Sequence, residues 1–149
     1  MKVEILTLCD FANADSSGRL NIIGAFDHMN SVQAPIIWGM CAIASKIRFT
    51  NSETGIKKIR ISFIDSDGHS VLPMIETQLP VQVPPGESTS STQMIVIMPQ
   101  LRLPHFGEYS IGLAIDGREE ASFPLFAKQI PSPPAIQPPP PEQQLPPTQ

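Results

Sequence analysis

The sequence predicts an all-β protein: an antiparallel two-sheet sandwich, immunoglobulin-like or a related Greek key, followed by a disordered proline-rich C-terminal tail. Three observations predict this fold class. Apolar and polar residues alternate in many stretches of residues 1–128, as they do in strands with one buried face. Asp-Gly pairs and other turn signals separate these stretches. Pro73, Pro80, Pro99 and Pro104 interrupt segments in which a helix could otherwise form.

The expected strands cover residues 3–9, 20–26, 37–49, 59–65, 79–83, 93–98, 109–116 and 119–126. The first two are apolar stretches joined by a Ser-Ser-Gly turn at residues 16–18. The third places Cys41, Ile43, Ile47 and Phe49 on one face, with small or basic side chains on the other. Such alternation indicates a strand, because successive side chains point to opposite faces of a sheet.

The later strands are bounded by recognisable turns. Asp67-Gly68 follows the fourth strand and Asp116-Gly117 follows the seventh, and both pairs favour hairpin turns because Gly accepts a positive φ. The fifth and sixth strands flank a longer Pro-Pro-Gly connection at residues 84–86. The seventh strand has the most regular alternation, and the eighth follows it after the turn. About seven or eight strands with turns of this kind are typical of sandwich folds.

Tyr109 is the only tyrosine in the chain, and it follows Gly107 where the seventh strand begins. In Greek-key sandwiches a tyrosine at such a strand entry donates its hydroxyl to backbone a few residues upstream, an arrangement called the tyrosine corner. We therefore expect a structural role for Tyr109, with a ligand contact as the alternative.

Composition divides the chain into a domain at residues 1–128 and a tail at residues 129–149. Nine of the 17 prolines fall in the last 19 residues, a composition typical of polyproline II segments that have little to bury. The domain is long enough for one self-sufficient core. We therefore expect the tail to be disordered and the domain to fold without it.

The charge of the chain bears on whether it binds nucleic acid, and the length of its apolar runs bears on its compartment. The formal net charge is −4 and the Lys and Arg residues are scattered, which excludes the clustered basic face typical of nucleic-acid binders. No apolar run is long enough to span a membrane or to act as a signal peptide. We therefore expect a cytoplasmic protein, with Cys9 and Cys41 as buried free thiols. A disulfide between strands is the alternative in an oxidising compartment.

Catalytic motifs are absent from the sequence, and we expect neither an enzyme nor a cofactor. The three histidines lie in or beside expected turns, and none has the context of an activated nucleophile. Asp65 and Asp67 are the only metal-ligand candidates, because closely spaced carboxylates on a loop can bind Ca²⁺. The Asp-Gly pair is sufficiently explained by a turn, so we expect no metal there.

Trp38 and Met40 are the candidate interaction residues. Both fall within expected strand 37–49, on the face opposite Cys41. If the second sheet leaves this face uncovered, they form an exposed apolar patch together with Ile36, and such patches mark interfaces. A core position for Trp38 is the alternative.

Two N-terminal motifs resemble a known family. The segment Leu8-Cys9-Asp10-Phe11-Ala12, followed by Gly18-Arg19-Leu20-Asn21-Ile22-Ile23-Gly24-Ala25-Phe26-Asp27, is similar to the start of a family of uncharacterised small bacterial proteins. The resemblance extends over residues 1 to about 128. It implies a compact β-sandwich and assigns no activity or functional residue.

Two functions remain open. The favoured one is a non-catalytic module that works by contact with another protein or with a second copy of itself. The alternative is a small-ligand or calcium-binding sandwich that uses loops at one end. An exposed apolar strand face predicts the first, and clustered ligand side chains on loops predict the second.

Removal of residues 130–149 should leave the domain folded, because a segment that buries little contributes little to stability. We expect the melting temperature of the truncated chain to stay within a few degrees of the full chain. Thermal unfolding followed by circular dichroism measures it. A loss of stability of several kcal/mol would show instead that the tail packs on the domain.

Overall fold

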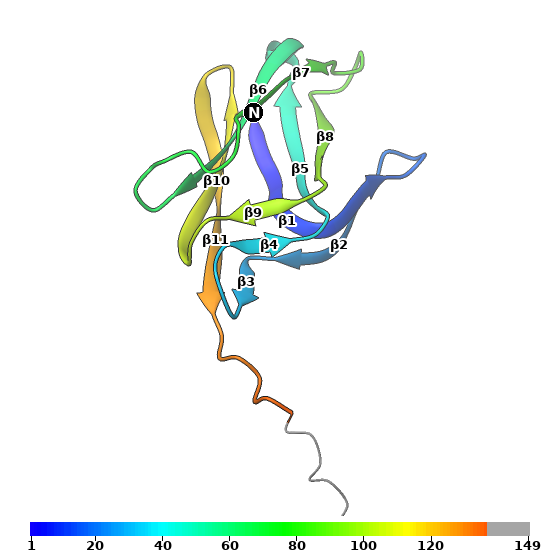
Figure 1. Ribbon diagram of the computed structural model, residues 1–149. Helices are drawn as coiled ribbons and strands as arrows, with labels where there is room; N and C mark the ends of the chain where they lie inside the picture. Colours follow the sequence, from blue (N-terminus) through cyan, green and yellow to red (C-terminus); the bar gives the residue numbers. More distant parts are fainter. Residues whose placement is uncertain (137–149) are drawn as a thin grey trace, which may run out of the picture.

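Strands form nearly all of the regular structure in residues 1–136, the part of the chain that the computed structural model describes (Figure 1). They are β1 (Lys2–Ala14), β2 (Leu20–Phe26), β3 (His28–Ser31), β4 (Ile36–Trp38), β5 (Cys41–Thr50), β6 (Gly55–Asp65), β7 (Ile75–Val81), β8 (Thr89–Met98), β9 (Leu101–Leu103), β10 (Gly107–Ile115) and β11 (Arg118–Gln129). One turn of 3-10 helix, Asn51–Glu53, lies between β5 and β6. The prediction of an all-β protein is confirmed. Most of the predicted disordered tail lies outside the described residues.

The strands form two larger sheets and one small one. The first sheet has the order β2-β1-β5-β8, the second has the order β3-β11-β10-β6-β7, and β4 pairs with β9. All neighbours are antiparallel except β3 and β11, which run parallel. The chain passes from the first sheet to the second at Asp27, between β2 and β3.

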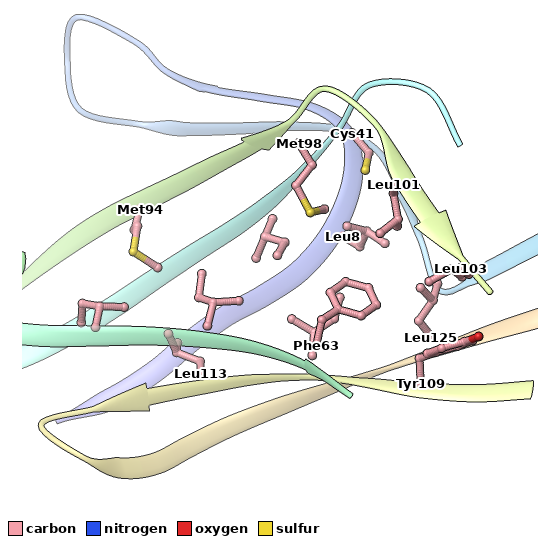
Figure 2. Packing of buried hydrophobic residues seen from close by; sticks show 14 of the residues in the cluster. Leu8, Cys41, Phe63, Met94, Met98, Leu101, Leu103, Tyr109, Leu113 and Leu125 are labelled. Atoms are coloured by element: carbon pink, nitrogen blue, oxygen red, sulfur yellow. The ribbon is translucent and has the colours of Figure 1, made fainter. Parts of the chain in front are cut away.

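Side chains from both larger sheets fill one hydrophobic core (Figure 2). The predicted inward face of β5 is confirmed, because Cys41, Ile43, Ile47 and Phe49 are all buried. Opposite them lie inward-facing residues of β6 and β10, which include Phe63, Tyr109 and Leu113. Burial of this much apolar surface is the main stabilising contribution to the fold.

The predicted strand at residues 37–49 is wrong, because two strands occupy this stretch. β4 ends at Trp38 and pairs with β9, whereas β5 begins at Cys41 and joins the first sheet. Gly39 and Met40 separate them. The apolar run across this junction conceals the break, since both strands are apolar. The strands β3 and β9 were not predicted, and they are only four and three residues long.

A second, smaller apolar cluster lies on the other face of the first sheet. Cys9, Ala12, Ala42 and Ala44 are buried there, with Leu20, Ile22 and Ile95 packed against them. The β1–β2 hairpin reaches over this face, where the Gln93 side chain donates a hydrogen bond to the Gly18 carbonyl oxygen at 2.6 Å. The small side chains of Ala42 and Ala44 let the hairpin approach β5 closely.

The two cysteines point to opposite faces of the first sheet. Cys9 pairs with Ala42 and shares its cluster, whereas Cys41, the preceding residue in β5, belongs to the main core. Both thiols are free and buried, as predicted, and the alternative of a disulfide between them is wrong. Burial raises both pKa values, that of Cys41 to about 11, so these thiols are poor nucleophiles.

Gly24 occupies a position in β2 that favours glycine. Its φ is +65°, and a Cβ added there would lie 2.3 Å from an Asp10 carboxylate oxygen on the adjacent strand β1. Both residues belong to the motifs on which the family resemblance depends. The positive φ and the close approach of the Asp10 side chain both favour glycine at this position.

Gly24→Ala should therefore destabilise the protein by about 1–3 kcal/mol, since alanine at positive φ is strained and its methyl group displaces Asp10. Gly39→Ala is the matched control, because a Cβ there meets no atom within 4 Å and φ is not positive. Urea unfolding of the two variants measures the difference. Equal stabilities would contradict this role for Gly24.

Candidate functional site

The turn between β6 and β7 is built around Asp65. Its Oδ1 accepts hydrogen bonds from the backbone N–H groups of Asp67 at 3.0 Å and His69 at 2.8 Å. Gly68 has φ +82° and donates its N–H to the Asp65 carbonyl oxygen at 3.0 Å. The predicted Asp-Gly turn is confirmed. These hydrogen bonds, first that from His69, hold the pKa of Asp65 below its usual value.

The predicted tyrosine corner is also confirmed. Tyr109 is 1% exposed, and its hydroxyl donates a hydrogen bond to the His105 carbonyl oxygen at 2.6 Å. The same hydroxyl accepts the His105 backbone N–H at 3.3 Å. Burial raises the pKa of Tyr109, so the phenol remains protonated at neutral pH. The corner fixes the loop between β9 and β10 against the start of β10.

These two features bring four potential metal ligands together, which we call the Asp65 cluster: Asp65, Asp67, His69 and His105. Asp65 Oδ2 lies 3.6 Å from His69 Nδ1 and 3.7 Å from His105 Nε2. One ligand atom each of Asp65, Asp67 and His69 lies within 4.8 Å of the others. The sequence identified the two carboxylates but neither histidine.

The pairing of β6 with β10 explains why His105 joins the cluster. Tyr109 lies directly opposite Asp65 in this ladder, and the corner holds His105 over the same end of the sheet. Sequence alone does not give this register, because both strands have the same alternation along their length. The Gly107-Glu108-Tyr109 motif was the available signal, since it predicts a loop tied back to Tyr109.

Trp38 and Met40 occupy different environments. Trp38 is half-buried against the core, with its ring 5.2 Å from that of Phe26. Met40 is 60% exposed, whereas Ile36 is buried. The expected common face does not form, because Gly39 and Met40 interrupt the strand. The packing favours a core role for Trp38, and an interaction role for either residue stays a prediction.

Within residues 1–136, strand β8 forms one edge of the first sheet and pairs with no strand on its outer side. It is ten residues long and contains neither a charged residue nor a proline. Among the other edge strands, β7 contains Glu76 and Pro80, β3 has four residues, and β2 contains Gly24 at positive φ. Charges, prolines, short length and irregular backbone are the features that protect sheet edges, and β8 has none of them.

A charged cavity of about 560 Å³ lies beside the β10–β11 turn, lined in part by Arg60, Glu76 and Asp116. Arg60 pairs with Glu76 at 3.1 Å, and Asp116 pairs with Lys57 at 3.2 Å. Asp116 Oδ1 also accepts the Lys58 backbone N–H at 2.9 Å. The two carboxylates that line the cavity are therefore already paired with basic side chains.

Comparison with known proteins gives a family and several distant structural likenesses, two of which are described below. The model described as "Family of unknown function (DUF6941)" matches residues 4–128. No curated protein matches the chain. Within residues 1–136, no helix has the length and apolar character needed to cross a membrane.

Two solved structures are similar over 85% of this chain. One is the Pseudomonas fluorescens alkylpurine DNA glycosylase AlkC bound to DNA containing an abasic site analog, with 9% identity and a TM-score of 0.39, and the chain spans 30% of its length. The other is an immunoglobulin-like protein from Pseudomonas aeruginosa, with 12% identity, a TM-score of 0.31 and 95% of its length covered. Likenesses this distant carry no argument about function.

Asp116 should make stability depend on pH. The Lys58 N–H hydrogen bond and the Lys57 side chain lower its pKa below 3.8, so its contribution is present above about pH 4 and is lost as pH falls through the lowered pKa. Asp116→Asn keeps the hydrogen-bond acceptor and tolerates the φ of 49°, but it removes the charge. The variant should be less stable than wild type at pH 7, and the difference should shrink towards pH 2.

Melting temperatures measured across this pH range test the expectation. Glu87→Gln, in the exposed connection between β7 and β8, serves as the control and should leave the profile unchanged. A constant difference between wild type and Asp116→Asn at every pH would contradict the electrostatic explanation.

Proposed function

The chain belongs to the family of unknown function DUF6941, and for it we propose a non-catalytic function in protein–protein contact. The edge of β8 would be the contact surface and a second copy of the chain the first partner. This proposal concerns the domain, and the cytoplasmic location predicted from the sequence is a separate prediction.

We further infer that the two larger sheets form a sandwich of immunoglobulin-like or related Greek-key topology. Two observations support this inference. Both sheets contribute to one core, and Tyr109 makes the backbone hydrogen bond that characterises the tyrosine corner of such sandwiches. Sandwich domains of this type leave strands at the edges of their sheets, and these edges are available for contact.

The single observation that carries the functional proposal is the composition of β8. An edge strand presents unpaired backbone N–H and C=O groups, which can pair with a strand of another chain. Ten residues without charge or proline offer a long uninterrupted row of such groups. Proteins normally protect an edge of this kind, so an unprotected one is best explained by a partner that covers it.

A second copy suits this edge because antiparallel pairing of β8 with itself is compatible with a two-fold axis. Such a contact uses the same surface on both subunits, so a charge near the two-fold axis would face its own symmetry mate. The strand has none. Exposed apolar side chains lie at its end: Ile97 is 59% exposed, and Met40 precedes Cys41, which pairs with Met98. These side chains would add apolar contact area beside the paired strands.

Ile97→Lys should weaken this association, because pairing would require the ammonium group to be desolvated beside the partner strand. Ile56→Lys is the matched control, since Ile56 is 68% exposed and lies on β6 in the other sheet. Light scattering across a concentration series measures the mass of each variant. We expect dimers for wild type and Ile56→Lys, and monomers for Ile97→Lys.

Two results would reject the proposal. A wild type that stays monomeric at high micromolar concentration would exclude a second copy as the partner. Dimers that persist unchanged in Ile97→Lys would place the contact elsewhere. Circular dichroism of each variant confirms that the substitutions leave the fold intact.

The alternative function, ligand binding by loops at one end of the domain, is favoured by one observation. The Asp65 cluster gathers ligand side chains from the β6–β7 turn and the loop before β10. Calcium was the ion that the sequence suggested for Asp65 and Asp67. The two imidazoles point to a different class of ion.

A further inference from the structure

We propose that the Asp65 cluster is a binding site for a divalent transition-metal ion, with Asp65, Asp67 and His69 as ligands and His105 able to supply a fourth. Zinc is the ion that the ligand set fits best. The site is independent of self-association, because none of its residues belongs to β8.

The separations between the ligand atoms fit an ion. Zinc binds imidazole nitrogen and carboxylate oxygen at about 2.0–2.2 Å with tetrahedral geometry, which places neighbouring ligand atoms roughly 3.3–3.6 Å apart. Asp65 Oδ2 lies 3.6 Å from His69 Nδ1 and 3.7 Å from His105 Nε2. Both distances are longer than a hydrogen bond. A shift of a few tenths of an ångström would bring each imidazole nitrogen to this separation from Asp65 Oδ2, and one ligand atom each of Asp65, Asp67 and His69 lies within 4.8 Å of the other two.

The orientation of His105 gives a second, independent reason. The Tyr109 hydroxyl proton is used in the bond to the His105 carbonyl oxygen, so the hydroxyl can only accept from His105 Nδ1, which lies 3.1 Å away. The other neighbour of Nδ1 is the Phe106 carbonyl oxygen at 3.3 Å, which also only accepts. Nδ1 therefore carries the proton, and in the neutral ring Nε2 has a free lone pair.

This lone pair faces the Asp65 carboxylate. The His105 Nε2 atom and Asp65 Oδ2 are 3.7 Å apart. Metal-bound histidines usually donate their second ring N–H to a neighbouring oxygen, as Nδ1 does here.

Asp65 is held in place to serve the site. Its side chain is 9% exposed, and its two backbone hydrogen bonds both use Oδ1. Oδ2 accepts no hydrogen bond from residues 1–136 and points to the two imidazoles. A carboxylate oxygen fixed in this way is positioned as a ligand before any ion arrives, which reduces the entropy lost on binding.

The ligand types decide which ion is expected. Ca²⁺ needs six to eight oxygen ligands, and this cluster has two carboxylates and two imidazoles. Imidazole nitrogen suits Zn²⁺, Ni²⁺ and Cu²⁺. His69 and Asp67 are exposed, so an ion can enter from solvent, and water can complete its coordination.

Isothermal titration of the folded full-length chain with ZnCl₂ tests the proposal. We expect one ion per chain, with binding weakened about tenfold or more in His69→Ala. His69 has a side chain 78% exposed, so the substitution should not disturb folding. His28→Gln is the matched control, because His28 is also partly exposed and adjoins a carboxylate, that of Asp27, but lies outside the cluster. This control should bind Zn²⁺ as wild type does.

Three outcomes would overturn the proposal. The first is no binding of Zn²⁺ at up to millimolar concentration. The second is binding of equal strength in wild type and His69→Ala, which would place the ion at another site. The third is binding of Ca²⁺ but not Zn²⁺, which would support the calcium alternative. Light scattering with and without Zn²⁺ separates this result from that for β8, since each site can fail alone.

Discussion

The structure around the candidate site depends on one buried hydroxyl group. Tyr109 places its ring in the core at 1% exposure, and a phenol buried this deeply must find a hydrogen-bond partner to offset its desolvation. It finds one in the backbone at His105, four residues upstream. The loop before β10 consequently has a fixed conformation, and the orientation of the His105 ring follows from the same contact. The hydrogen bond that the buried Tyr109 hydroxyl requires thus also positions the His105 side chain at the surface.

The sequence predicted the parts of the fold that depend on local alternation. The inward faces of β5, β6 and β10 follow from residues such as Ile43, Ile61 and Leu113, which recur at every second position. The boundaries of β2 were predicted to the residue. The break at Gly39 was missed, because apolar side chains continue on both sides and only tertiary pairing separates β4 from β5. Strands as short as β3 are too brief to show a period.

The candidate sites also combine features that are local in the sequence with features that depend on strand pairing. Asp65 and Asp67 could be identified from a local turn signal, whereas His105 joins them only through the β6–β10 register and the corner at Tyr109. Likewise, the composition of β8 is plain in the sequence, but its position at a sheet edge is a property of the complete topology. Site residues that lie close together in the sequence can be predicted from it. Site residues from different strands can be predicted only when the register of strand pairing is known.

The parallel pairing of β3 with β11 determines how the chain can reach its native state. His28 pairs with Phe126 and Ser31 with Gln129, so β3 finds its neighbour only after almost the whole domain has been synthesised. Contacts between residues this distant in sequence close large loops, and chains rich in such contacts fold slowly, over milliseconds to seconds. A ribosome-bound chain that lacks its last strand leaves β3 and the adjacent edge of β10 unpaired. The domain therefore completes its second sheet only late in synthesis, and a nascent chain exposes two strands that can pair wrongly until then.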